Sequence, residues 1–257
     1  MAMKQTSSDV TKPAVLGTHT AGGDGVVGRG RRGVVGESDD FQGVFGRSRG
    51  NAGVVGESDQ LHGVFGVCHN PNGGGLFGTN DNGGFGLVCD SPTGVGLVAT
   101  GGRLAAQFRG DVEVTGDIRL MNGDCAELFD AAPDTELAPG TVVVLNDDGL
   151  LEPCSQDYDP RVVGVIAGSA PYRPGIVLDC ASSSAASRPV AVLGKVMCWV
   201  DATASPVLTG NLLTTSHRPG HATVASNRLA AAGAVIGKAL APLSSGKGLV
   251  PMLVMLR

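Results

Sequence analysis

A tetrad of two apolar residues between two glycines recurs through the first part of the chain. Its clearest copies lie at 25–28, 33–36, 43–46, 53–56, 63–66 and 75–78. The central copies start ten residues apart, and 33–46 matches 53–66 at all but three positions. Internal self-similarity of this kind is typical of repeat architectures rather than of a globular domain built around a pocket.

Each tetrad predicts a short strand that is buried on both faces, because successive side chains of a strand point to opposite sides. The flanking glycines permit positive φ or a close approach of two backbones, and either suits a tight corner. Polar turns separate the strands. We predict that a shared core is formed by Val34, Val44, Phe45, Val54, Val64, Phe65, Leu76 and Phe77.

Ten residues span at most about 33–36 Å, too little for one chain to wind a full coil around a filled core. The first four polar turns alternate in charge: 29–32 and 47–52 are basic, whereas 37–42 and 57–62 are acidic. Three intertwined chains with one repeat per layer place opposite charges above one another. A single-chain coil of three repeats does so too. A coil of two repeats would instead stack like charges in the same column. Exposed pairs contribute only about 0–1 kcal/mol each, so this is an argument about the register of the repeats and not about stability. We favour the homotrimer.

From about Asp111 the tetrads stop, and longer apolar runs alternate with turn signals such as Pro-Gly and Asp-Gly. Many short strands with such punctuation predict a compact β-barrel or sandwich. We therefore divide the chain into an N-terminal arm at 1–22, a β-helical stalk at 23–110 and a C-terminal β-rich domain at 111–257. The strands predicted in that domain are Thr141–Leu145, Arg161–Ile166, Gly175–Leu178, Val190–Val200, Asn211–Thr215, Ala234–Ala239 and Leu249–Leu256.

Composition supports an all-β protein, with 41 glycines and only 4% aromatic residues among 257. The net charge of −5 gives no reason to expect nucleic-acid binding. No apolar run is long enough to span a membrane, and no apolar signal segment follows Met1. We expect synthesis in the cytoplasm, which allows later release as part of a particle.

Five motifs of the C-terminal part resemble a widespread bacterial and phage domain that commonly follows such repeats. They are DCAELF at 124–129, PGTVVV at 139–144, NLLTTS at 211–216, PGHA at 219–222 and IGKAL at 236–240. The resemblance covers most of 111–257 and is to uncharacterised bacterial proteins. This domain is similar to the chaperone, sometimes self-cleaving, domains that end phage tail-spike and appendage proteins. The repeats resemble the trimeric β-helical shafts of such fibres.

The resemblance implies a homotrimer in a virion or phage-tail-like particle, attached through the arm and in contact with a surface glycan. It also implies that self-cleavage would release the domain at the junction between Asp111 and Cys125. Family members often carry Asp where this chain has Asn211, and this departure weakens any role for a carboxylate there.

Candidate chemistry concentrates in one Pro-Gly loop. Ser216 with His221 as its base could form a nucleophilic pair, with Asp201 upstream as a third member. The alternative is a turn whose polar groups satisfy its own backbone. His217 and His221 have an H-x3-H spacing that Cys198 could complete as a metal site, but Pro219 and Gly220 preclude the helical face on which that spacing is informative.

Two further patterns are weaker. Asp124, Glu127 and Asp130 could pair as glycosidase carboxylates, or they could be solvated acids. The Gly-x-Gly-x-x-Gly match at 28–33 belongs to the repeat and precedes no predicted helix. We predict no cofactor. The sequence favours a structural, trimeric, spike-like protein over a self-cleaving or polysaccharide-acting enzyme and over a metal- or ligand-binding module.

Overall fold

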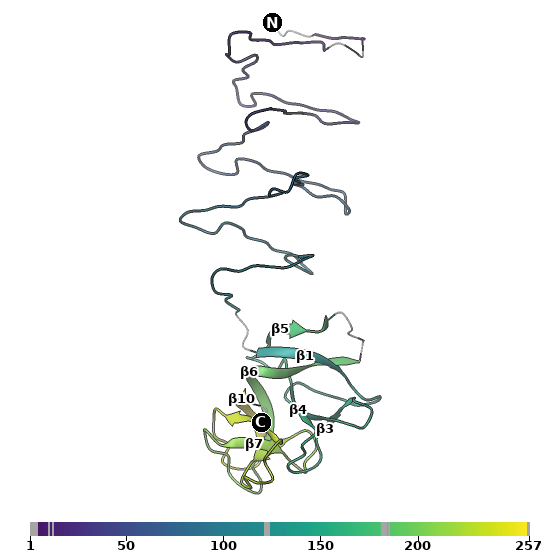
Figure 1. Cartoon of the computed structure of the whole chain (residues 1–257), viewed down its shortest axis with the longest axis vertical. Helices are drawn as coiled ribbons and strands as arrows, with labels where there is room; N and C mark the ends of the chain where they lie inside the picture. Colours follow the sequence, from purple (N-terminus) through teal and green to yellow (C-terminus); the bar gives the residue numbers. More distant parts are fainter. Residues whose placement is uncertain are drawn as a thin grey trace. The chain divides into compact units, whose positions relative to one another are not determined.

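The computed structural model describes residues 5–9, 11, 13–120, 124–180, 184 and 186–255. Parts of three predicted features lie outside the described residues: 1–4, 10 and 12 of the arm, 121–123 of the junction, and Leu256 of the last predicted strand. The chain divides into two compact units, 1–107 and 108–257, which are coloured along the sequence in Figure 1.

The first unit forms no β-strand among its described residues, and Figure 1 draws it as a trace of successive long turns. Its only backbone–backbone hydrogen bonds in the described part are two turn contacts, from Gly73 N–H to the Asn70 carbonyl and from Gly94 N–H to the Ser91 carbonyl. Among the described residues, the tetrads therefore pair with no strand of their own chain, and the predicted stalk strands are not formed.

The glycines of the tetrads close the polar turns at their bases. A Cβ atom placed on Gly36 would overlap the carbonyl oxygen of Gly43, and one on Gly56 would overlap that of Gly63. None of these four glycines has a φ in the left-handed region. Of the two roles that the sequence allows, the structure shows close backbone approach.

The second unit is all-β, as predicted, and no α-helix occurs in its described residues. Its strands are β1 (Asp124–Asp130), β2 (Val142–Leu145), β3 (Leu151–Pro153), β4 (Val162–Ile166), β5 (Pro174–Leu178), β6 (Ser187–Asp201), β7 (Leu212–Thr215), β8 (Ala222–Val224), β9 (Val235–Ala239) and β10 (Lys247–Val254). All seven predicted strands of this unit are confirmed, with shifts of a few residues at their ends.

The long strand β6 organises the second unit, because it pairs with β1, β4, β8 and β10. Its C-terminal half completes a ring of pairings, β6–β10–β9–β7–β8–β6, which closes a five-stranded barrel. The last closure is a parallel contact between Val200 of β6 and Ala222 of β8. Small and medium side chains fill the interior, among them Val196, Cys198, Val200, Leu213, Ile236 and Met252.

The N-terminal half of β6 carries a second, smaller part of the sheet. There β4 and β1 pair with β6, and β2 joins β4 to β3. A separate core cluster that includes Val143, Leu151, Ile166 and Val190 lies in this part. At its edge, β5 pairs only with β1, in parallel. Edge strands of this kind offer unpaired backbone groups to another chain.

Candidate functional site

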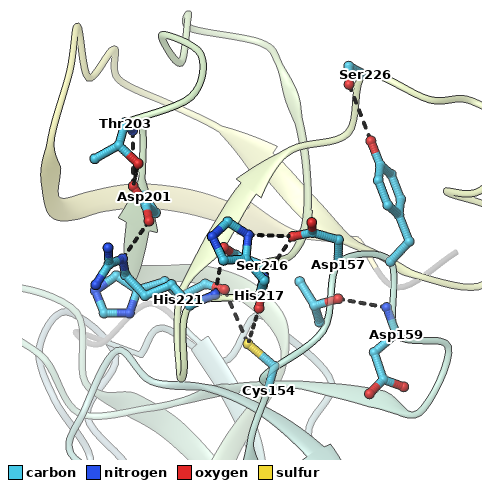
Figure 2. A network of polar contacts seen from close by, with 12 residues as sticks. Cys154, Asp157, Asp159, Asp201, Thr203, Ser216, His217, His221 and Ser226 are labelled. Carbon is cyan, nitrogen blue, oxygen red and sulfur yellow. Dashed lines mark hydrogen bonds and ion pairs between the residues drawn. The ribbon is translucent and has the colours of Figure 1, made fainter.

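The candidate residues from 216 to 221 form the loop between β7 and β8, shown in Figure 2. The Ser216 N–H donates a hydrogen bond to the His221 carbonyl at 3.0 Å, which closes the loop at its base. Gly220, at a φ of 71°, donates its N–H to the Cys154 carbonyl at 2.8 Å, and its carbonyl accepts from Val142 N–H at 2.9 Å. Backbone hydrogen bonds therefore fasten the loop to β2 and to the residue that follows β3.

The hydroxyl of Ser216 makes a hydrogen bond within this loop. Ser216 is 1% exposed, and its Oγ accepts a hydrogen bond from Arg218 N–H at 3.1 Å. The Nδ1 of His221 lies 2.8 Å from the Pro219 carbonyl oxygen. Both residues are described, and no hydrogen bond joins the Ser216 hydroxyl to the His221 ring. The structure thus lacks the nucleophile–base contact that the sequence pattern suggested, and the loop satisfies its own backbone.

The three candidate metal ligands have separate surroundings. His217 is exposed, and Asp157 Oδ1 accepts its backbone N–H at 2.7 Å and lies 3.3 Å from its ring Nδ1. Cys198 is buried in the barrel with its Sγ directed at the Trp199 carbonyl, and burial raises the pKa of its thiol. In the described part of the chain, no group of three or more His, Cys, Asp and Glu residues is arranged to hold a metal ion.

Asp201, the upstream carboxylate, engages an arginine instead of a histidine. It is 3% exposed at the end of β6; its Oδ1 accepts the Thr203 hydroxyl at 2.6 Å, and its Oδ2 accepts Arg218 Nε–H (Figure 2). The Thr203 hydroxyl first, and then Arg218, hold the pKa of Asp201 well below its ordinary value. This ion pair anchors the loop through Arg218, its third residue.

The two acids at the ends of β1, Asp124 and Asp130, lie too far apart to act as a pair. Asp124 is 5% exposed, and neither carboxylate oxygen has a hydrogen-bond partner. Asp130, at the other end of β1, accepts hydrogen bonds from the Ser184 and Ser187 hydroxyls at 2.8 and 2.6 Å. Six steps along the strand separate Asp124 from Asp130 by about 20 Å, more than the roughly 5–10 Å between paired glycosidase carboxylates.

A groove of about 390 Å³ opens beside the loop. It is lined by Glu136, Thr141, Pro153, Trp199, Pro219, Gly220 and His221. Trp199 is the only tryptophan of the chain and is half-buried on β6, and its ring lies 6.0 Å from that of His221, at 45° to it. Pockets of this size, with an aromatic wall and a few polar groups, are typical of small-ligand sites.

Two glycines bring backbone close to the walls of this groove. Gly140, at a φ of 94°, accepts Trp199 N–H at 2.9 Å, and a Cβ there would lie 3.1 Å from Cδ1 of the indole. A Cβ on Gly220 would lie 2.9 Å from Cγ2 of Thr141. Larger residues at either position would push on the indole or on Thr141, so both glycines set the shape of the groove.

Of the lining residues, the sequence patterns singled out His221 alone as a candidate. Trp199 and Glu136 belong to different segments, which meet only in the folded barrel. The one signal that could have pointed to the groove was the presence of a single tryptophan in a chain with 4% aromatic residues.

No protein-family model and no curated protein matches this chain. Among solved structures, it is similar to the C-terminal fragment of gene product 12 of bacteriophage phi29, with 17% identity and a TM-score of 0.36, over 51% of this chain and 100% of that one. It is also similar to pre-mature gene product 12 of the same phage, with 16% identity and a TM-score of 0.42. That match covers 57% of this chain and 23% of the other.

The described residues include no helix that is long and apolar enough to cross a membrane.

Proposed function

We propose that this chain is one subunit of a homotrimeric, fibre-like structural protein, in which three copies intertwine through the stalk. The observation that carries the proposal is the exposure of the tetrad side chains in one chain: Phe45 and Phe65 are each 77% exposed, and Phe77 is 90% exposed. The other predicted core residues, Val34, Val44, Val54, Val64 and Leu76, are exposed as well. A stable soluble protein rarely leaves so long a series of apolar residues in water.

The same observation favours three chains over a single-chain coil. A coil of three repeats would bury the tetrads against other tetrads of its own chain and would join them by hydrogen bonds. The described stalk has neither the burial nor the bonds. Other copies are the simplest source of both, because identical tetrads on each chain lie at the same height in a parallel trimer.

The C-terminal unit offers a second place for copies to meet. On its edge strand β5, three consecutive residues, Ile176, Val177 and Leu178, are 43%, 38% and 44% exposed. Consecutive residues point to opposite faces, so both faces of this strand carry uncovered apolar surface. We propose that this unit sets the register of the three chains, and that the arm at 1–22 attaches the trimer to a larger particle.

The test is the mass of the full chain in solution, measured by light scattering in native buffer and again in denaturant. We expect a native mass near three times the 25.8 kDa of one chain, and the mass of one chain in denaturant. A native mass equal to one chain would overturn the proposal.

A further inference from the structure

We propose that the groove beside Trp199 binds one pyranose unit of a carbohydrate. All of its lining residues come from the second unit of a single chain, so the site does not depend on the trimer proposed above. The inference therefore stands or falls separately from the oligomeric state.

The indole of Trp199 supplies the apolar contact. A pyranose ring has one face of C–H groups, which packs on a flat aromatic surface, and hydroxyl groups around its rim. Trp199 is half-buried and is the largest side chain on the groove wall, with Pro153 and Pro219 also lining the groove. An aromatic ring that combines a large apolar face with a polar edge suits a ligand of this mixed character.

The polar side chains of the groove match the rim of a sugar. Glu136 is exposed, and its carboxylate accepts no hydrogen bond from the described residues. Neither the Thr141 hydroxyl nor the indole N–H of Trp199 is engaged within the described chain. An ionised carboxylate only accepts, an indole N–H only donates, and a hydroxyl does both. Sugar hydroxyls donate and accept, so they can satisfy all three groups.

His221 adds an acceptor whose orientation is fixed. Its Nδ1 lies 2.8 Å from the Pro219 carbonyl oxygen, and a carbonyl oxygen can only accept a hydrogen bond. Nδ1 therefore carries the proton, which leaves Nε2 of the neutral ring as a hydrogen-bond acceptor. The ring is held beside the indole at 6.0 Å, so a ligand stacked on Trp199 comes within reach of it.

A second cavity adjoins the groove, so a longer carbohydrate can extend beyond the first sugar. A neighbouring cavity of about 620 Å³ shares Glu136 with it and extends past Ala131 to Arg188. An oligosaccharide is the carbohydrate form that uses two adjoining spaces. A proline-rich peptide is the competing ligand, but grooves for such peptides are lined by several aromatic residues, and this one has a single indole and one imidazole.

The single tryptophan makes the test specific. The full-length protein is titrated with chitohexaose, maltohexaose and a mannose hexamer, and with a decaproline peptide as the competing probe. Fluorescence of Trp199 reports directly on the groove, and calorimetry gives the affinity. We expect one of the three sugars to bind saturably with a change in fluorescence, and decaproline to leave the signal unchanged.

Variants then assign the binding to the groove. Glu136→Gln, on an exposed side chain, should weaken binding by about tenfold while the protein stays folded, and Trp199→Ala should weaken it by at least about tenfold in calorimetry. Glu57→Gln, which removes the same charge from a stalk turn, should leave the affinity unchanged. Binding of none of the sugars, saturable binding of decaproline instead, or sugar binding that Glu136→Gln leaves intact would overturn the proposal.

Discussion

The close approach of tetrad glycines makes a sharp prediction about two glycine-to-alanine substitutions only six residues apart. Gly56 lies at the base of the polar turn 57–62, where a new Cβ would overlap the carbonyl oxygen of Gly63 and lie 2.6 Å from Cγ2 of Val64. Gly50 lies in the preceding turn, and a Cβ there would have no atom within 4 Å. Neither glycine has a φ in the left-handed region, so backbone strain does not distinguish them.

The two substitutions should therefore act in opposite directions. At Gly56 the obstacle is backbone, which cannot swing aside as a side chain can, so the turn must open. Inserting a methyl group into a filled space typically costs about 1–3 kcal/mol. At Gly50, alanine restricts only the unfolded chain and should stabilise by about 0.4–1 kcal/mol. In a trimer, each effect occurs once per chain.

Calorimetric melting of the purified full-length variants measures this difference. We expect Gly56→Ala to lower the melting temperature of the stalk by several degrees relative to Gly50→Ala, at equal protein concentration. Gly36→Ala repeats the test at the equivalent position of an earlier turn, where the overlap is with Gly43. Equal melting temperatures for Gly56→Ala and Gly50→Ala would refute the close approach as the reason for these glycines.

Three other predictions concern single residues. Phe65→Asp should prevent assembly of the soluble trimer in light scattering, because an unpaired buried charge costs about 3–5 kcal/mol in each chain; an unchanged mass would mean that this face stays in water. Burial raises the pKa of Asp124. The folded protein therefore loses stability as pH rises above the ordinary value of 3.8, because the buried carboxyl must then ionise. Asp124→Asn removes the charge that burial disfavours and should then raise the free energy of unfolding at pH 7 in urea titrations, with little gain below pH 3.8, whereas a loss at pH 7 would contradict this interpretation. Ser216→Ala and the natural chain should each give one intact mass, because the Ser216 hydroxyl is held by Arg218 N–H; two fragments from the natural chain that this substitution abolishes would restore the catalytic interpretation.

The strands that the sequence predicted are those with a run of apolar residues between turn signals. Three strands were not predicted. The first, β1, carries acidic residues at 124, 127 and 130, which interrupt its apolar pattern. The other two, β3 and β8, have three residues each, too few to show a period of two.

Which strands pair with one another could not be predicted from the sequence, for a different reason. Closure of the barrel rests on contacts between segments far apart in the chain, such as Val200 with Ala222 and Lys247 with Asp201. A periodic pattern shows that a strand has a buried face but not which strand lies beside it. The resemblance to trimeric fibres likewise named an architecture, while the contacts between chains stay a prediction.

The groove shows how closure of the barrel determines which side chains of β6 point inward, a choice that the sequence pattern leaves open. From Val196 to Val200 every residue is apolar, so either parity of this segment could face the core. A ring of only five strands encloses a narrow interior, since barrel diameter grows with strand number. Val196, Cys198 and Val200 fit inside it, and all three are fully buried. An indole needs more room, so the parity that fills the barrel with small side chains places Trp199 on the outer face, where Gly140 and the His221 loop build the groove around it.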